Sequence, residues 1–239
     1  MGVRVADAVL GGGDSRVEAW IVEPADGRVR AGILFLHWLG EHHSDRTQFL
    51  AEARAYAEQG VRCVLPAGRL PWEPDPVDAR TDITNIEIEQ LRLGAALDRL
   101  ASGLSKGTPL ALVGHDFGAM HGLVLASRRQ AFKSAVLIAA TPRWGDWFLR
   151  FWRVGGDRFD YLRRLAPYDP VTVARDLRAK ALWQFSERDF YIAAMSAIEL
   201  ARASGPDPMI EWYQADHAMR SVRARRARAR FLRRELRLT

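Results

Sequence analysis

One short motif in the sequence has the residue types and spacing to do chemistry. Gly114, His115, Asp116, Phe117 and Gly118 stand in a row, with a glycine two residues to either side of the aspartate. A strand-type apolar run precedes the motif and a helix-type pattern follows it. Such a turn strains its central residue, and side chains at the glycine positions would collide with neighbouring backbone. The motif therefore predicts a nucleophile raised above a sheet edge, with a helix N-terminus aimed at it.

Strand-type and helix-type segments alternate along most of the chain, which indicates a mostly parallel sheet with helices on both faces. A hairpin with a glycine turn at residues 11–14 precedes the alternation. We expect eight strands, at residues 3–10, 17–24, 31–37, 61–66, 110–114, 134–140, 179–185 and 209–213. We expect helices at residues 45–59, from 82 or 84 to 103, from 117 onward, at 191–203 and at 220–237. The predicted class is α/β, with Asp116 directly after the fifth strand.

An aromatic insert at residues 141–170 interrupts the alternation after the sixth strand. Helical i, i+3, i+4, i+7 spacing gives it one apolar face, formed by Trp144, Trp147, Phe148 and Phe151. We interpret the insert as a short lid that lines an apolar pocket. Core packing, a membrane-surface helix and a dimer helix are the alternatives. Internal repeats and linker-like runs are absent, so residues 1–239 are predicted to form a single domain.

Three further segments follow predicted strands and match a known family. HWLGE at residues 37–41 follows the third strand, QFSERDF at 184–190 follows the penultimate strand, and DHA at 216–218 follows the last. Together with the motif at 114–118, these segments resemble the α/β-hydrolase superfamily. The resemblance covers nearly the whole chain.

The resemblance implies roles for six residues. The catalytic nucleophile, acid and base would be Asp116, Asp189 and His217, in the chain order of the superfamily. The oxyanion hole would combine the backbone N–H of Phe117 with that of Trp38 or Leu39. The implied fold is an α/β-hydrolase fold with an eight-stranded sheet.

Each implied role has a structural alternative. Asp116 could be the N-cap of the following helix. Asp189 could be a solvated turn residue, and Glu187 is a nearby rival for the acid. His217 could be structural at the start of a helix. For His115 we favour a structural role, because the residue before a nucleophile packs against the sheet.

No metal or cofactor is expected. His42 and His43 stand beside Asp45, but adjacent histidines do not easily converge on one ion. The one cysteine, Cys63, lies in an apolar strand-type run, where a thiol behaves as a small hydrophobe.

An aspartate at this position restricts the chemistry. Attack of the Asp116 carboxylate on an ester would form a mixed anhydride and expel a more basic alkoxide, so the intermediate would collapse backwards. At a saturated carbon, displacing a halide or opening an epoxide leaves a stable alkyl ester. His217, oriented by Asp189, would then activate a water that attacks the ester carbonyl. This logic resembles epoxide hydrolases and haloalkane dehalogenases, whose motif commonly reads GHD.

The chain also departs from those families. Phe117 stands where haloalkane dehalogenases typically have a halide-binding Trp and fluoroacetate dehalogenases have an Arg. The loop after the third strand reads HWLG, whereas epoxide hydrolases usually have HGxP. Tyr161 and Tyr168 could protonate an epoxide oxygen or could be packing residues. The HWLG and QFSERD segments look more like the dienelactone-hydrolase-like branch, which ordinarily uses cysteine or serine.

The charge distribution argues against a nucleic-acid partner. The formal net charge is +6, with only three lysines, and the arginines are densest at residues 220–237. That segment also carries an apolar helical stripe, which predicts a solvated terminal helix. There is no run of about 18 apolar residues and no basic start followed by an apolar run, so we expect neither a membrane span nor a secretory signal. The expected protein is cytoplasmic and acts on a small molecule, and its lid is compatible with a homodimer.

Three functional hypotheses follow. The first is a cofactor-free hydrolase that forms a covalent Asp116 ester with a small, largely apolar epoxide or alkyl halide. Its substrate site would include the insert residues Trp144, Trp147, Phe148, Tyr161 and Tyr168. The second is a degenerate, non-catalytic hydrolase-fold protein that binds a ligand. The third is a dienelactone-hydrolase-like enzyme that transfers protons without a covalent step. The retained Asp189 and His217 pair favours catalysis.

Overall fold

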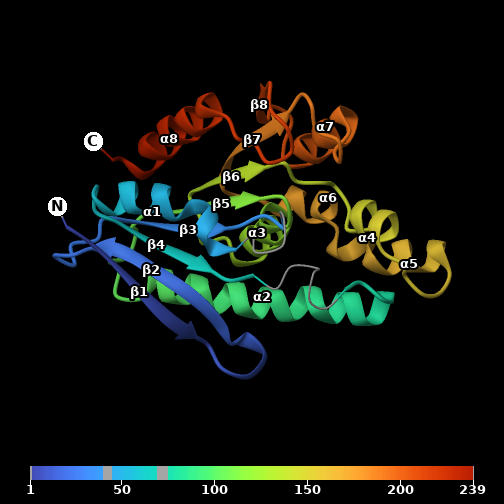
Figure 1. The fold of residues 1–239 in the computed structure, drawn as a ribbon, viewed down its shortest axis with the longest axis horizontal. Helices are drawn as coiled ribbons and strands as arrows, with labels where there is room; N and C mark the ends of the chain where they lie inside the picture. Colours follow the sequence, from blue (N-terminus) through green and yellow to red (C-terminus); the bar gives the residue numbers. More distant parts are fainter. Residues whose placement is uncertain (1, 40–44, 69–74, 239) are drawn as a thin grey trace.

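An eight-stranded sheet forms the centre of the computed structural model, which describes residues 2–39, 45–68 and 75–238 (Figure 1). The strand order is β1-β2-β4-β3-β5-β6-β7-β8. The pairs β1–β2 and β2–β4 are antiparallel, and every pair from β4 to β8 is parallel. The strands are β1 (Val3–Leu10), β2 (Val17–Pro24), β3 (Ala31–Leu36), β4 (Val61–Pro66), β5 (Leu110–His115), β6 (Ser134–Ile138), β7 (Lys180–Ser186) and β8 (Met209–Tyr213). The predicted mostly parallel α/β sheet is confirmed.

The register brings the carboxyl ends of the parallel strands to one edge of the sheet. Leu36 at the end of β3 pairs with Gly114 of β5, and Ile138 of β6 pairs with Gln184 of β7. All residues of β3, β5 and β6 are buried, because helices cover both faces of a parallel sheet. The loops that follow these strands therefore emerge side by side, which is where parallel sheets place their ligands.

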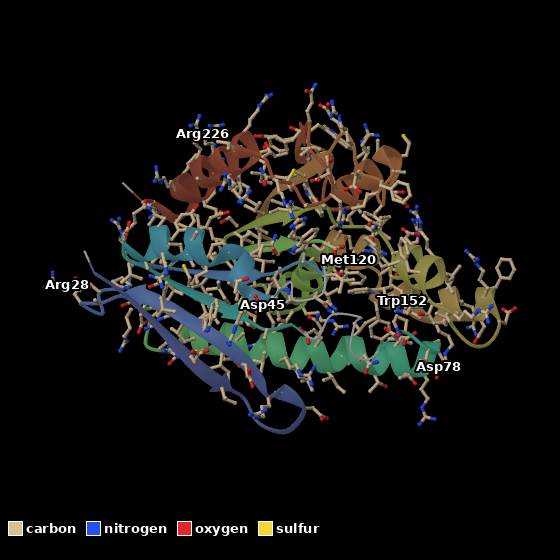
Figure 2. The ribbon with its side chains drawn as sticks, viewed as in Figure 1. Arg28, Asp45, Asp78, Met120, Trp152 and Arg226 are labelled. Carbon is tan, nitrogen blue, oxygen red and sulfur yellow. The ribbon has the colours of Figure 1, made fainter. Side chains whose placement is uncertain are left out.

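Helices cover both faces of this sheet. Figure 1 shows α1 (Leu50–Ala57) and α8 (Val222–Leu236) on one side and α2 (Ala79–Ala101) on the other, where α2 packs against α3 (Phe117–Arg129). Apolar residues of α8 are buried, whereas Arg226 projects outward from the helix (Figure 2). No helix in the described ranges is both long enough and apolar enough to cross a membrane.

The first two predicted helices begin at other residues than the sequence predicts. The second helix starts at Ala79 rather than at 82 or 84, because the Asp78 carboxylate accepts hydrogen bonds from the N–H groups of Arg80 and Thr81 at 2.8 and 2.9 Å. The segment predicted as one helix at 45–59 is a 3₁₀ turn, η2 (Arg46–Phe49), followed by α1. Asp45 does cap this segment, since its side chain accepts from the Thr47 N–H at 2.7 Å.

The segment at 141–170 folds onto one end of the molecule. It contains α4 (Gly145–Phe151), α5 (Arg158–Leu165) and η3 (Ala166–Tyr168), and leads into α6 (Pro170–Val173) and η4 (Ala174–Asp176). The last helix between strands is α7 (Ala194–Ala203). Figure 1 shows α4 and α5 at the end opposite to the chain termini, beside the start of α2.

Tyr161 anchors this segment to the body of the protein. Its hydroxyl donates to Asp82 Oδ2 on α2 at 2.7 Å, and Asp82 Oδ1 also accepts the Val77 N–H at 3.1 Å. Burial raises the pKa of Asp82 above its ordinary value, although both hydrogen bonds act in the opposite direction. Tyr168 lies elsewhere, with its ring 5.8 Å from the guanidinium carbon of Arg128.

Replacing Tyr161 with Phe leaves a buried carboxylate oxygen without its donor. We expect Tyr161→Phe to lower the free energy of unfolding by about 1–3 kcal/mol, measured by urea denaturation. Tyr168→Phe is the matched control and should change it by less than about 0.5 kcal/mol. Equal losses in the two variants would contradict the anchoring role.

Candidate active site

The loop around Asp116 has the strained geometry that the sequence predicts. Asp116 adopts φ 53° and ψ −120° between β5 and α3. A Cβ atom on Gly114 would lie 2.6 Å from the Gly118 carbonyl oxygen, and one on Gly118 would lie 2.3 Å from the His37 carbonyl oxygen. Both glycines are therefore required by close backbone approach. Asp116 occupies the N-cap position of α3, but its side chain makes no capping hydrogen bond, which argues against the capping alternative.

The structure brings the three residues of the implied triad together from three strand ends. His217 Nδ1 lies 2.8 Å from Asp189 Oδ2, and His217 Nε2 lies 3.6 Å from Asp116 Oδ1. All three side chains are buried, with exposed fractions of 8% for His217, 3% for Asp189 and 2% for Asp116. The imidazole ring thus stands between two carboxylates that water hardly reaches.

A tight loop after β7 orients the Asp189 carboxylate. Its Oδ1 accepts the N–H groups of Tyr191 and Ile192 at 2.8 and 3.0 Å, which leaves Oδ2 to face His217. The same turn explains why α7 begins at Ala194 rather than at the predicted residue 191. Glu187, the rival acid, is exposed.

Only one of the two candidate amides after β3 points at Asp116. The Leu39 N–H donates to Asp116 Oδ2 at 3.2 Å, whereas the Trp38 N–H donates to Gln48 Oε1 at 2.9 Å. Phe117 is the first residue of α3, where backbone N–H groups have no partner within the helix. Of the two candidates after β3, the geometry therefore favours Leu39 over Trp38 as the predicted oxyanion donor, and the Phe117 N–H at the start of α3 stays a prediction.

Two facing atoms of this arrangement are in ion-pair distance but make no hydrogen bond. Within the described ranges, Asp116 Oδ1 and His217 Nε2 are buried and have no hydrogen-bond partner. They face each other across the 3.6 Å gap. A buried polar atom without a partner is costly for stability and is typical of functional sites.

The two carboxylates determine the protonation of His217. Burial of the ring lowers the pKa of His217, but attraction to Asp116 and Asp189 outweighs it and raises the pKa from 6.5 to about 9. At neutral pH the ring is therefore an imidazolium. Losing the negative charge on either carboxylate would lower this pKa again.

A cavity of about 540 Å³ opens beside these residues. Aromatic side chains form much of its wall, and two arginines lie at its edge. The lining residues include Trp38, Trp147, Phe151, Trp152, Phe190, Tyr191, Arg188 and Arg220, together with Leu39, Asp116 and His217. Trp152 lies close to the start of α2, where Asp78 is seen (Figure 2).

The insert contributes to this cavity differently from the prediction. Trp147 lines it, with its ring centroid 5.6 Å from that of His217. Trp144 and Phe148 are instead buried against Phe117, each with centroids 6.2 Å apart.

Tyr161 and Tyr168 are not among the residues that line this cavity. Tyr161 is held by Asp82, as described above. The tyrosine beside His217 is Tyr191, and the two ring centroids lie 5.0 Å apart. The helical spacing in the insert gave no signal for Tyr191, because it reaches the site from the loop after β7.

Two further sequence interpretations concern histidines. His115 is buried, and its Nε2 lies 2.9 Å from the His217 carbonyl oxygen, in keeping with the structural role we favoured. His42 and His43 lie outside the described residues. In the part of the chain that the structure describes, no group of three or more His, Cys, Asp or Glu side chains could hold a metal ion.

Comparison with solved structures identifies the fold. An acylaminoacyl peptidase from Pyrococcus horikoshii superposes with a TM-score of 0.75 at 14% identity, over 98% of this chain and 42% of the peptidase. The esterase domain of a Rhodothermus marinus protein gives 0.67 at 18% identity, over 98% and 99% of the two chains. A Klebsiella pneumoniae protein provisionally assigned as a dienelactone hydrolase gives 0.67 at 18%, over 97% and 98%. The chain has the α/β-hydrolase fold.

This result confirms the fold that the resemblance implies. The chain spans less than half the length of the peptidase and nearly the full length of the other two structures. No protein-family model matches it, and no curated protein matches it in sequence. Because an α/β-hydrolase fold hosts many reactions, the function has to be argued from the site.

The charge arrangement predicts how His217 titrates. We expect its pKa near 9 in the native chain, and Asp116→Asn or Asp189→Asn should each lower it by roughly 1 to 3 pH units. NMR titration of the imidazole resonances measures this. Because folding raises the pKa, the stabilisation is complete below pH 6.5 and is lost as the pH rises to about 9. An unchanged pKa in both variants would contradict the charge arrangement.

Proposed function

We propose that the protein is a hydrolase that forms a covalent ester between Asp116 and a small apolar substrate, an epoxide or an alkyl halide. One observation carries the proposal. Asp116 Oδ2 accepts the Leu39 N–H, while Oδ1 is buried beside His217 Nε2. The oxyanion site thus holds an oxygen of the nucleophile itself. A substrate ester would have to displace that oxygen, whereas an alkyl ester on Oδ1 would leave Oδ2 in place as its carbonyl oxygen.

In the first step, Asp116 Oδ1 attacks a saturated carbon of the substrate. The new C–O bond forms as the bond to the halide or to the epoxide oxygen breaks, and the leaving group takes the electron pair. Asp116 becomes a neutral ester. One of the two negative charges that raise the pKa of His217 is thereby removed. The imidazolium then gives up its proton, to the opened epoxide oxygen or to solvent when halide leaves.

In the second step, neutral His217 is a base. It takes a proton from water as the water oxygen attacks the ester carbonyl carbon. Negative charge develops on Oδ2, where the Leu39 and Phe117 N–H groups stabilise it by on the order of 3 kcal/mol per donor. The bond between the carboxyl carbon Cγ and Oδ1 then breaks, Oδ1 leaves as the oxygen of the product alcohol with one proton of the water, and the water oxygen stays in the Asp116 carboxylate. The other proton stays on His217, which restores the initial imidazolium and carboxylate.

The cavity walls support a small, largely apolar substrate. Its volume of about 540 Å³ falls within the range for small-molecule sites. Trp147, Phe151 and Tyr191 form a connected aromatic wall, with ring centroids 5.2 to 5.8 Å apart. Such a wall excludes water and favours apolar groups next to the carboxylate.

Trp147 is suited to assist the leaving group. Its indole Nε1 is buried and has no hydrogen-bond partner among the described residues. The Trp147 ring lies against the ring of Phe117, the residue that follows Asp116, with centroids 5.3 Å apart. An indole N–H is a donor only, so it can receive a halide or a developing alkoxide. Trp147, on α4, would thus supply the side-chain N–H that the phenylalanine at position 117 lacks.

Removing the base should trap the covalent intermediate. With His217→Gln and an accepted epoxide or haloalkane, we expect a stoichiometric adduct on the peptide that contains Asp116, because alkylation uses the carboxylate and does not need the base. Intact-protein and peptide mass spectrometry detect it. The doubly substituted His217→Gln, Asp116→Ala chain is the matched control and should carry no adduct. In ¹⁸O water the native protein should place label in the Asp116 carboxylate before the product.

The same experiment separates the alternatives. Turnover that places ¹⁸O directly in the product without an adduct would favour non-covalent proton transfer. Ligand binding without turnover would favour a degenerate hydrolase. The structural neighbours include an esterase domain and a peptidase, so p-nitrophenyl esters belong in the screen. Strong esterase activity that survives Asp116→Ala would contradict the proposed nucleophile.

The leaving-group role of Trp147 has a matched control in Trp152. Both side chains line the cavity, but the Trp152 Nε1–H donates to Asp75 Oδ1 at 3.0 Å. We expect Trp147→Phe to slow adduct formation by about 10- to 100-fold, since one donor to the developing charge is lost. Trp152→Phe should slow it less than about threefold. Stopped-flow quenching of Trp fluorescence or timed mass spectrometry gives the rates; equal slowing in both variants would contradict the role.

A further inference from the structure

We propose that Gln48 and His115 are positioning residues that connect the segment after β3 to His217 through hydrogen bonds. They would hold the Leu39 N–H and the His217 ring in place together. The inference rests on the roles that the proposed function gives to Leu39 and His217. Neither Gln48 nor His115 contacts the reacting atoms. Both would act through the backbone of the residues that do.

Three hydrogen bonds form the connection, which we call the relay. The Trp38 N–H donates to Gln48 Oε1 at 2.9 Å. Gln48 Nε2 donates to His115 Nδ1 at 2.7 Å, and His115 Nε2 donates to the His217 carbonyl oxygen at 2.9 Å. The relay therefore starts one residue before the Leu39 N–H and ends on the main chain of the base.

The hydrogen-bonding partners allow only one protonation pattern. The His217 carbonyl can only accept, so His115 must carry its proton on Nε2. His115 Nδ1 then accepts from the Gln48 amide, whose oxygen is left to accept the Trp38 N–H. Burial lowers the pKa of His115 to about 3, so the ring stays neutral and keeps this pattern. Each of the three hydrogen bonds of the relay thus pairs one donor with one acceptor.

Ring stacking reinforces one end of the relay. The Trp38 ring lies parallel to that of His115, with centroids 5.1 Å apart and planes 6° apart. Trp38 is therefore fixed by its main chain through Gln48 and by its side chain through His115. This leaves the next residue, Leu39, little freedom to turn its N–H away from Asp116 Oδ2.

A second cavity makes the hydrogen bonds of the relay more important. This cavity has a volume of about 540 Å³ and is lined by Gln48, His115 and Trp38, among others. Trp38 also lines the cavity beside Asp116. Because open space lies next to Gln48, its position depends on hydrogen bonds more than on close packing. Loss of one bond should therefore let both ends of the relay move.

The relay is tested with Gln48→Met, which keeps the length of the side chain and removes both hydrogen bonds. We expect the Leu39 amide to exchange with solvent at least about tenfold faster, because its neighbour is no longer held. The pKa of His217 should fall from about 9, because its main chain is released from His115. Both readouts come from NMR and need no substrate. With an accepted substrate, kcat should fall by on the order of 10- to 100-fold with little change in KM.

Gln59→Met is the matched control on the same stretch of chain. The Gln59 side-chain amide donates to the Ala55 carbonyl oxygen at 2.7 Å, and Gln59 lines neither cavity. This variant should leave the Leu39 exchange rate, the His217 pKa and kcat unchanged.

Gln48→Glu separates the two ends of the relay and covers a failure of Gln48→Met to fold. A glutamate can still accept the Trp38 N–H, but as a carboxylate it cannot donate to His115 Nδ1. Leu39 exchange should therefore stay slow, and the pKa of His115 should rise from about 3, since a negative charge now faces its ring.

The outcomes distinguish this inference from the proposed function. Unchanged Leu39 exchange and an unchanged His217 pKa in folded Gln48→Met would overturn the relay, and so would equal changes in Gln59→Met. The absence of any Asp116 adduct in all variants would overturn the covalent mechanism alone, while the NMR changes would still support the relay.

Discussion

The geometry of the site depends on the close approach of the first turn of α3 to the loop after β3. Gly118 is the contact point, since a Cβ atom there would lie 2.3 Å from the His37 carbonyl oxygen. Because backbone meets backbone there, the strained Asp116 at the start of α3 stands next to the loop after β3. The Leu39 N–H of that loop donates to the Asp116 carboxylate at 3.2 Å. A larger residue at position 118 would push the two segments apart and take this donor away from the carboxylate.

Electrostatics supplies the second constraint. One imidazole lies between two buried carboxylates, and its raised pKa follows from their combined charge. In this arrangement the charge on Asp116 and the protonation of His217 influence each other directly. In the mechanism that we propose, His217 holds a proton as long as Asp116 is charged and can release it once Asp116 is esterified. The order of the two chemical steps would therefore follow from charge alone, without a conformational change.

The sequence predicted the sheet and its strands, and it named the three residues that meet in the candidate site, because these depend on local patterns. Apolar runs, the two glycines of the 114–118 motif and the residues after strand ends can all be recognised in a single chain. The sequence could not show where individual N–H groups and side chains point. Trp38 and Leu39 are equally good candidates until Gln48 is seen to bind the Trp38 N–H. Tyr161 had the right residue type and segment, but its hydroxyl points to Asp82. Tyr191 and Trp147 reach the base through packing between distant segments.

The hydrogen bond from Leu39 to Asp116 has a practical consequence for chemical proteomics. Fluorophosphonate and boronate reagents label hydrolases through a hydroxyl nucleophile and place an oxygen of the reagent in the oxyanion site. In the site that we propose, the Leu39 N–H already binds Asp116 Oδ2, and a carboxylate nucleophile would form only a labile bond to phosphorus or boron. With Asp116 as the nucleophile, activity-based profiling with such reagents would pass over this protein in a cell extract. Electrophiles that alkylate carboxylates, such as small epoxides bearing an alkyne tag, are the reagents that match the nucleophile we propose.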